Sequence, residues 1–571
     1  MDSQRLELEL GVEKDEGNIE YKLKLINLDS DTFTKRSTQM LYRVNEGNGE
    51  AIYYIGVLDN GSVIGINIDE YNESIKNLNT IASNINCSVS TIVENSVSVS
   101  VSVSVSISVN RLYYGVFLVR IIEDQYIDLR IGVAGNVDAG KSTTIGTLTY
   151  GILDDGRGKA RINVFNHRHE IETGRTSSIS SQILGYDLNG EVVNSKFLRQ
   201  PTWTDIVNKS FKVITFYDLA GHEKYLKTTI YGLTSIYPDY CLIMVGANVG
   251  ISHMTREHIG LCVTLKIPFI IIITKIDIAP SNILEETITS INTIIKNGIR
   301  KKPYMIKNKD DIFNAIKLMN SETIIPVIQI SNVSNINLDL LKIFLNLLPL
   351  KNTYSGKKNN PIQFNVDNTY SVVGHSTIVS GLLVSGTVRI GDNLYIGPFS
   401  DSSYKKIKVR TIHCKYRDIK EASAGSYVCL SLKNITRNEI RKGLVIIDDN
   451  CSKIATKTFY AFIHILHSPT TIKIGYQPFI HVEHIKQTVK IVDIQKIENS
   501  KKKPNPNNLL DIDRQNLTFD VKTDDEIILR TGDIAYVKLE FIFIPEYIKP
   551  DMKLVFREGK VKAIGKVVEL C

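Results

Sequence analysis

The segment from residue 135 to residue 143 has the glycines, lysine and hydroxyl groups of a phosphate-binding loop. It consists of Gly135, Asn136, Val137, Asp138, Ala139, Gly140, Lys141, Ser142 and Thr143. These residues follow a predicted strand and precede a helix-compatible run, which is the context that the motif requires. Backbone N–H groups can then surround a β-phosphate, Lys141 can reach the β- and γ-oxygens, and Ser142 can bind Mg²⁺. The sequence therefore predicts a nucleoside triphosphate with Mg²⁺ here, and a chance match is the alternative.

A second polar group is expected to select the base. Thr274, Lys275, Ile276 and Asp277 follow the apolar run 269–273. The Asp277 carboxylate could accept both the N1–H and the 2-amino group of guanine, which adenine lacks, while Lys275 packs along the base. The motif usually starts with Asn, but the Thr274 hydroxyl could still join this loop to the phosphate loop. An isolated T-K-x-D is more often a surface turn. The pair Ser331-Asn332, at the end of the next predicted strand, is where a backbone N–H for guanine O6 is expected, and Ser331 is counted among the binding residues.

A third group lies between these two in the sequence. Asp218, Leu219, Ala220, Gly221 and His222 close an alternating apolar strand over 211–217. Asp218 could hold the metal site, the Gly221 N–H could bind the γ-phosphate, and His222 could orient an attacking water. A single histidine after a glycine is more often structural, but the order of the three motifs favours catalysis. We therefore predict a guanine nucleotide site with Lys141, Gly221 and His222 in the catalytic set.

The elements that must position these motifs fall into several domains. Short apolar runs alternate with longer amphipathic stretches over residues 127–350, which predicts a mostly parallel sheet with helices on both faces. Residues 1–126 indicate a small α+β domain, and its Ser–Val alternation over 96–109 could be a strand or a disordered insertion. Residues 351–360 are a polar linker. Short strands and turns then predict two small β-barrels over 361–452 and 453–571.

Composition limits the classes of function. The 571 residues carry a formal net charge of +7, which allows an acidic partner such as RNA without requiring one. Seven cysteines are scattered without a C-x-x-C pair, so no zinc site is indicated. The chain shows neither a signal peptide nor about 18 consecutive apolar residues, so we expect a cytoplasmic protein without a membrane span. The basic loop at 500–508 is either a solvated hairpin tip or an RNA contact.

The three motifs resemble those of translational GTPases of the elongation factor Tu class. Further segments resemble the family of GTP-binding proteins 1 and 2 over most of the chain: 46–51, 156–161, 169–179, 225–230, 255–258, 467–471 and 556–559. The resemblance implies a P-loop GTPase domain followed by two elongation-factor-like barrels. It also implies that Thr176 is the switch threonine that meets Mg²⁺ and the attacking water, so Ser142, Thr176 and Asp218 form the expected metal set. The Ser–Val repeat is foreign to the family and, with heavy Ile, Asn and Lys usage, suggests a giant-virus homologue.

Two positions bear on the elongation-factor pattern. Arg175 stands where elongation factors place an apolar side chain beside His222, which alters the hydrophobic gate that Val137 would complete. Arg175 could instead reach the γ-phosphate or contact a partner's phosphates. Asp138 keeps the acidic position that can hold a monovalent cation in related factors.

These observations predict a Mg²⁺-dependent GTPase that hydrolyses GTP to GDP and phosphate and thereby switches its contact with RNA. The expected partner is tRNA, mRNA or the ribosome, and no DNA or membrane is expected. Two alternatives stay open: a nucleotide-gated module that binds proteins and hydrolyses little GTP, and a regulatory GTPase of a metabolic enzyme.

Overall fold

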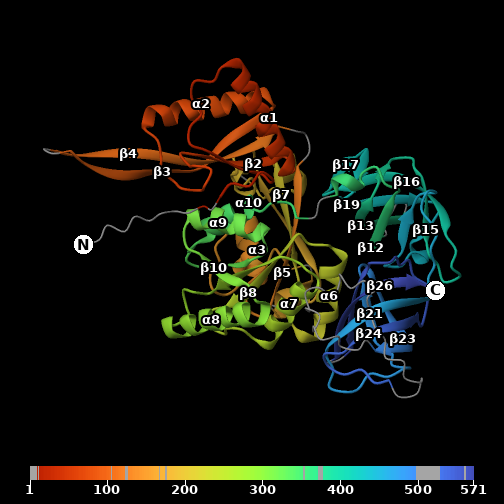
Figure 1. Cartoon of the computed structure of the whole chain (residues 1–571). Coiled ribbons are helices and arrows are strands. Elements are labelled where there is room, and N and C mark those ends of the chain that lie inside the picture. Colours follow the sequence, from red (N-terminus) through yellow and green to blue (C-terminus); the bar gives the residue numbers. More distant parts are fainter. Residues whose placement is uncertain are drawn as a thin grey trace.

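The computed structural model shows a central α/β domain that carries a smaller sheet domain and two barrels (Figure 1). It describes residues 10, 12–103, 106–122, 126–165, 167–173, 176–197, 199–351, 354–370, 377–496, 527–558 and 561–571. The fold class predicted from the sequence is confirmed. In the parts of the chain that are described, no helix is long and apolar enough to cross a membrane.

The central sheet has seven strands in the order β10-β11-β9-β8-β5-β7-β6. They are β5 (Ile127–Gly135), β6 (Ser180–Tyr186), β7 (Lys212–Asp218), β8 (Tyr240–Gly246), β9 (Phe269–Thr274), β10 (Lys302–Ile306) and β11 (Ile324–Gln329). All neighbours pair in parallel except β6, which is antiparallel to β7 at the edge. Because β5, β7 and β9 are parallel, the loops that follow them meet at one edge of the sheet.

Helices cover both faces of this sheet, which explains why its strands are apolar on both sides. The helices of this domain are α3 (Lys141–Tyr150), α4 (Arg168–Thr173), α5 (Trp203–Lys209), α6 (Leu226–Ser235), α7 (His253–Thr264), α8 (Ser281–Thr293), α9 (Lys309–Asn320) and α10 (Leu338–Leu347). Residues of α3, α9 and α10 share one buried cluster with the strands, and residues of α6, α7 and α8 share the other. Short helical turns lie at Lys159–Arg161, Asn194–Lys196, Glu223–Tyr225, Ile294–Ile299, Ser355–Lys357 and Arg437–Glu439.

The N-terminal domain is a four-stranded sheet in the order β1-β2-β4-β3. Its elements are β1 (Ile19–Lys22), α1 (Ser30–Glu46), β2 (Glu50–Ile55), α2 (Ile68–Asn84), β3 (Cys87–Val103) and β4 (Ser106–Ile121). Strands β3 and β4 form a long ribbon that extends away from the rest of the molecule (Figure 1). The described part of the Ser–Val segment lies in this ribbon, so of its two interpretations the structure has the strand.

A buried polar network joins the N-terminal domain to the central one. Glu50 of β2 accepts from the Lys212 amine at 2.6 Å and from the Arg120 guanidinium at 3.1 Å. Arg120 also donates to Asn346 Oδ1 at 2.7 Å, and Lys212 donates to the carbonyls of Asn346 and Leu348. The Arg120 and Lys212 side chains are fully buried. Glu50, Arg120 and Lys212 are charged and shielded from solvent, so each needs these partners to be stable in the interior. The network therefore packs the two domains together as one body.

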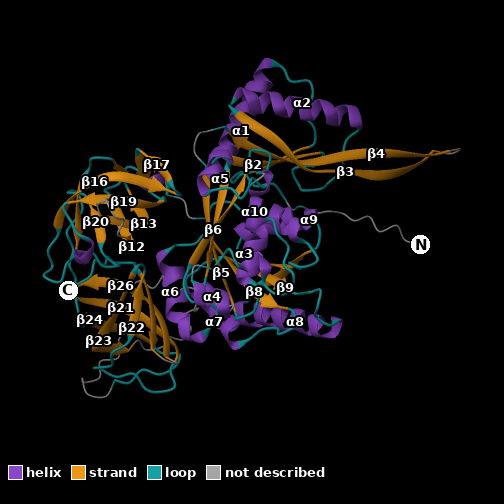
Figure 2. Cartoon of the chain, turned by 180° about the vertical axis from the view of Figure 1, so that it is seen from behind, coloured by secondary structure: helices purple, strands orange, loops and turns teal. Residues whose placement is uncertain are grey.

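Two closed barrels follow, stacked beside the central domain (Figure 2). The first barrel comprises β12 (Gln363–Tyr370), β13 (Thr377–Ser385), β14 (Thr387–Arg389), β15 (Asn393–Gly397), β16 (Lys405–Cys414), β17 (Arg417–Ile419), β18 (Glu421–Ser423), β19 (Tyr427–Lys433) and β20 (Val445–Ile447). Pairing of β15 with β16 closes it. The second barrel comprises β21 (Thr458–His467), β22 (Phe479–Val482), β23 (Ile485–Lys496), β24 (Ile534–Phe541), β25 (Lys553–Glu558) and β26 (Val561–Leu570), in the order β21-β24-β23-β22-β25-β26.

Candidate functional site

The predicted phosphate loop connects the end of β5 to the start of α3. Gly135 has φ of +146°, and a Cβ added there would lie 2.4 Å from the carbonyl oxygen of Met244 on β8. A side chain would therefore push the loop off the sheet. Asp138 is exposed and has a left-handed φ of +59°. Val137 and Thr143 are half-buried on either side of the turn.

Lys141 lies inside the loop, where its amine donates to the carbonyls of Gly135 at 3.2 Å and Asn136 at 2.7 Å. Burial lowers the pKa of Lys141, and the charges of Asp218 and Asp138 oppose this shift. Gly221 packs directly over the loop: a Cβ on it would come within 2.5 Å of the Lys141 amine and 2.6 Å of the Gly135 carbonyl oxygen. Only glycine lets these two segments approach so closely.

Three side chains whose oxygens could bind a metal come together beside Lys141, each from a separate segment. Ser142 Oγ donates to Asp218 Oδ2 at 2.5 Å, and Thr176 Oγ1 lies 3.0 Å from Ser142 Oγ and donates to Asp218 Oδ2 at 3.1 Å. Asp218 Oδ1 is buried and has no hydrogen-bond partner among the described residues. Burial raises the pKa of Asp218, while Lys141 and the two hydroxyls oppose the rise. One carboxylate with two hydroxyls is a donor set that suits Mg²⁺ completed by phosphate oxygens.

His222 is exposed at the start of the turn that leads into α6. Its Nδ1 accepts from the backbone N–H of Lys224 at 3.1 Å, so the neutral ring carries its proton on Nε2. Its ring contacts Tyr225 at a centroid distance of 6.1 Å. In this arrangement Nε2 can donate to a water or to a phosphate oxygen. Leu219 and Ala220, which precede Gly221, are buried in the core.

The loop after β9 lies against the phosphate loop. Thr274 Oγ1 donates to the carbonyl of Ala139 at 2.9 Å, which is the link that the sequence predicts in place of the usual Asn. Lys275 has a left-handed φ of +60° and is half-buried, as is Ile276, whereas Asp277 is exposed. An exposed carboxylate at this edge is free to meet a base.

The turn after β11 holds the two residues expected to offer a backbone N–H to guanine O6. The Ser331 N–H already donates to the Ile336 carbonyl at 3.1 Å, and Ser331 Oγ accepts from the Val333 N–H at 3.2 Å. For the Asn332 N–H the structure describes no acceptor. Asn332 Nδ2 donates to Thr144 Oγ1 of α3 at 2.9 Å, which ties this turn to the phosphate helix. Of the two backbone N–H groups in the expected pair, the one of Asn332 is thus the one without a described acceptor.

Comparisons with known proteins agree with this arrangement. Residues 128–350 match the elongation factor Tu GTP-binding domain, and residues 376–447 match elongation factor Tu domain 2. GTP-binding protein 1 of Xenopus laevis is 39% identical over 96% of this chain and 78% of its own length. GTP-binding protein 2 of Mus musculus is 40% identical over 98% of this chain and 88% of its own length. The chain belongs to the family of GTP-binding proteins 1 and 2.

More distant likenesses set the family among translation factors. Elongation factor 1-alpha of Archaeoglobus fulgidus is 25% identical over 72% of this chain and 89% of its own length. The elongation factor SelB from Methanococcus maripaludis, solved with a GTP analogue, matches with a TM-score of 0.52 at 16% identity, covering 79% of this chain and 80% of that one. The SelB likeness concerns the fold alone. This member of the GTP-binding protein 1/2 family is thus a translational GTPase that binds GTP and GDP. None of these relatives tests the suggested viral origin.

One family-like segment contains a residue that the sequence analysis did not single out. Glu170 of α4 is fully buried and accepts from the backbone N–H groups of Ser177 and Ser178. These two residues follow Thr176 directly. No spacing pattern signals a carboxylate that binds a segment seven residues away, because the contact forms only in the folded chain. Arg175 lies outside the described residues, as does the basic loop with Lys501–Lys503.

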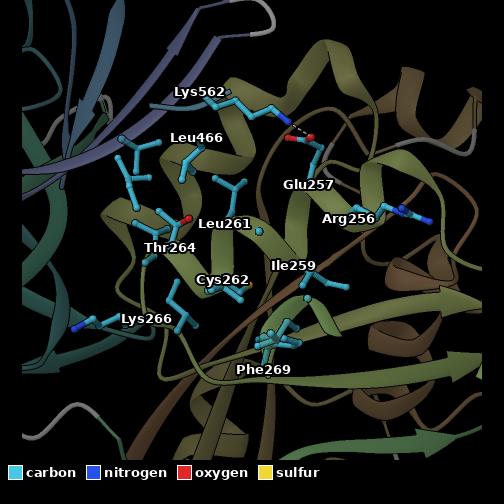
Figure 3. A pocket seen from close by; sticks show the side chains of 18 of the residues that line it. Arg256, Glu257, Ile259, Leu261, Cys262, Thr264, Lys266, Phe269, Leu466 and Lys562 are labelled. Atoms are coloured by element: carbon cyan, nitrogen blue, oxygen red, sulfur yellow. Dashed lines mark hydrogen bonds and ion pairs between the residues drawn. The ribbon is translucent and has the colours of Figure 1, made fainter. Parts of the chain in front are cut away.

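A cavity of about 700 Å³ lies away from the nucleotide site, between α7 and the second barrel. Figure 3 shows Leu261 and Leu466 lining it from the two sides. At its rim Glu257 of α7 pairs with Lys562 and, at 2.9 Å, with Arg557 of the second barrel. The lining contains no residue of the three nucleotide motifs. We assign it to the interface between domains.

Proposed function

We propose that this translational GTPase uses Mg²⁺ to hydrolyse GTP and that the bound nucleotide switches its contact with RNA or the ribosome. The observation that supports this most is that the side chains of Ser142, Thr176 and Asp218 contact one another, although Thr176 comes from a separate loop. A loop that binds the metal set more firmly with GTP than with GDP can report the nucleotide state to a partner. A cytoplasmic location stays a prediction.

Each residue has a separate task in the proposed reaction. Lys141 would leave its loop carbonyls to neutralise the β- and γ-oxygens, and the Gly221 N–H would bind the γ-phosphate. His222 would orient the water through its Nε2–H, and the Thr176 carbonyl would accept from the same water. Mg²⁺, held by Ser142, Thr176 and Asp218, would offset the charge that develops on the phosphate oxygens.

Selection of guanine would come from two loops at the same edge. Asp277 would accept the N1–H and 2-amino protons, and the Asn332 N–H would donate to O6. Lys275 would pack its stem against the base. Since these contacts use donors and acceptors that adenine does not match, ATP should bind much more weakly than GTP.

A basic face on the first barrel supports RNA as the partner. Lys408 of β16 lies in register opposite Lys433 of β19, and Lys406 lies opposite Tyr395 of β15. All three lysines are exposed, and the structure describes no ion pair for them. Lys453 stacks on the Tyr395 ring with its amine 3.5 Å from the centroid. Like charges directly opposite each other destabilise a sheet, so a phosphate backbone would relieve this repulsion.

Binding and turnover measured together test the proposal. We expect slow GTP hydrolysis by the protein alone, faster hydrolysis with ribosomes or tRNA, and loss of both with EDTA. RNA binding should fall steeply as salt rises, and it should differ between a non-hydrolysable GTP analogue and GDP. Lys408→Glu with Lys433→Glu should weaken RNA binding, whereas the same change at Lys35 and Lys76 in the N-terminal helices is the matched control.

Two results would redirect the assignment. Salt-insensitive or absent RNA binding in both nucleotide states, without stimulated turnover, would favour a nucleotide-gated module that binds proteins. Stimulation by a metabolic enzyme instead of RNA would favour the regulatory alternative.

A further inference from the structure

We propose that Glu170 is a positioning residue that holds the Thr176 loop ready for GTP. The inference rests on the proposed function, since Glu170 is assigned a task only through Thr176. It concerns a side chain whose described hydrogen bonds go to His167, Ser177 and Ser178.

Glu170 accepts hydrogen bonds from Ser177 and Ser178, the two residues that follow Thr176. Its Oε1 accepts from the Ser177 N–H at 2.7 Å, the Ser177 hydroxyl at 2.8 Å, the Ser178 N–H at 3.0 Å and the Ser178 hydroxyl at 3.2 Å. Its Oε2 accepts from the His167 N–H at 3.2 Å. The residue has 0% exposure. A buried carboxylate with this many donors binds its loop more firmly than a neutral acceptor would.

The first of these bonds orients Thr176 itself. The Ser177 N–H and the Thr176 carbonyl belong to one planar, trans peptide group, so they point in opposite directions. When Glu170 binds the N–H, the Thr176 carbonyl must point away from Glu170. The same segment keeps Thr176 Oγ1 within 3.0 Å of Ser142 Oγ and 3.1 Å of Asp218 Oδ2. Glu170 thus sets the direction of one Thr176 oxygen while the metal set holds the other.

His169 adds a second support from the same helix. Its Nε2 lies 2.8 Å from Ser177 Oγ, and because that hydroxyl donates to Glu170, it accepts from His169. The three side chains form a short chain of hydrogen bonds that ends on the buried carboxylate. Ordering the loop in advance lowers the entropy lost when GTP binds, and GDP, which does not need Thr176, gains nothing from it.

Nucleotide affinities separate this role from a merely structural one. With Mg²⁺ present, Glu170→Ala should lower the affinity for a non-hydrolysable GTP analogue by about tenfold or more, since several charge-assisted bonds are lost, and change GDP affinity less than about twofold. Glu170→Gln should shift the ratio in the same direction but less, because its amide would turn a donor towards the His167 N–H. Glu172→Ala is the matched control, because Glu172 lies on the same helix, is exposed and pairs with Arg168.

A double-mutant cycle tests whether Glu170 acts through Thr176. The Glu170→Ala, Thr176→Ala double variant should bind the GTP analogue no more weakly than Thr176→Ala alone. Additive losses, or an equal loss of GDP and GTP affinity with a lower unfolding midpoint, would overturn the inference. So would normal GTP affinity in Glu170→Ala when Thr176→Ala is impaired. A Thr176→Ala variant with unchanged GTP and Mg²⁺ affinity would instead overturn the proposed function.

Discussion

His222 and Asp277 reach solvent beside a buried phosphate loop, so each can be changed without disturbing the core. Among the described residues, the side chain of His222 has contacts with its own turn, through Lys224 and Tyr225. Asp277 is exposed, and the described hydrogen bond to Ala139 comes from Thr274 instead. Substitutions at these two positions should therefore report chemistry and base selection separately from folding.

We expect His222→Ala to lower single-turnover GTP hydrolysis by about 10²-fold or more, the range for a group that positions a water or handles its proton. GTP affinity should stay within a few fold, because the described contacts of the ring are with Lys224 and Tyr225 of its own turn. Rapid-quench assays with calorimetry measure the two quantities. Equal losses of binding and turnover would indicate a structural histidine.

Asp277→Asn should weaken GTP binding and shift preference towards xanthosine triphosphate. The amide presents a donor where guanine also presents one, whereas xanthine offers a carbonyl oxygen in place of the 2-amino group. Calorimetry with both nucleotides measures the shift. If the wild-type protein binds ATP as tightly as GTP, the assignment of the loop from Thr274 to Asp277 is wrong.

Strand β22 carries a histidine into the wall of the second barrel. His481 is 1% exposed, and neither ring nitrogen has a hydrogen-bond partner among the described residues. Burial, with smaller contributions from Lys486 and Lys227, lowers the pKa of His481 from 6.5 to about 3. The folded barrel therefore holds the His481 ring in its neutral form. Because acid protonates the ring more readily in the unfolded chain, low pH should favour unfolding.

The pH dependence has a definite sign. Between pH 6.5 and 3 the unfolded state binds a proton at this ring and the folded state does not, so the free energy of unfolding falls as pH falls, by up to about 1.4 kcal/mol per pH unit. His481→Leu should remove this part of the slope. Chemical denaturation at pH 7.5 and 5.0 measures it, with His467→Leu, an exposed position on β21, as the control. An unchanged slope in His481→Leu would contradict the assignment.

The units of the molecule are joined by charged and polar contacts on several sides of the central domain. Lys415 of the first barrel donates to both oxygens of Asp128 at 2.9 Å. Helix α6 starts just after His222, and its Tyr231 hydroxyl donates to Asp367 of the first barrel at 2.5 Å. A movement of the segment that ends at His222 would therefore shift α6 and its contact with the first barrel. The N-terminal domain contacts the opposite end of β7, at Lys212.

Glu50→Ala should destabilise the N-terminal and central domains together, by about 3–5 kcal/mol, because it leaves two buried cations without their carboxylate. Differential scanning calorimetry should show one transition shifted to lower temperature. Glu46→Ala, at the exposed end of α1, is the control. An unaltered midpoint in Glu50→Ala would mean that the two domains unfold independently.

Local pattern was enough to predict the motifs and the class of each domain. The glycine and lysine spacing of the phosphate loop, the apolar runs of β5 and β9, and the short strands after residue 361 depend on neighbours in sequence, and periodicity records these directly. The Thr274 contact with Ala139 followed from the chemistry of a hydroxyl in that place. The antiparallel edge strand β6 did not follow, because its direction depends on which strand it pairs with.

The remaining features depend on residues that meet only after folding. Glu50 and Lys212 are 162 positions apart, and no local sequence pattern around either residue predicts their contact. The Ser331 N–H is taken by the Ile336 carbonyl, which leaves the Asn332 N–H as the proposed donor to guanine O6. The proposed role of Glu170 depends on burial, which removes water as a competitor for the N–H groups of His167, Ser177 and Ser178. Spacing along the chain predicts which groups are available, but burial and the approach of distant backbone decide which of them pair.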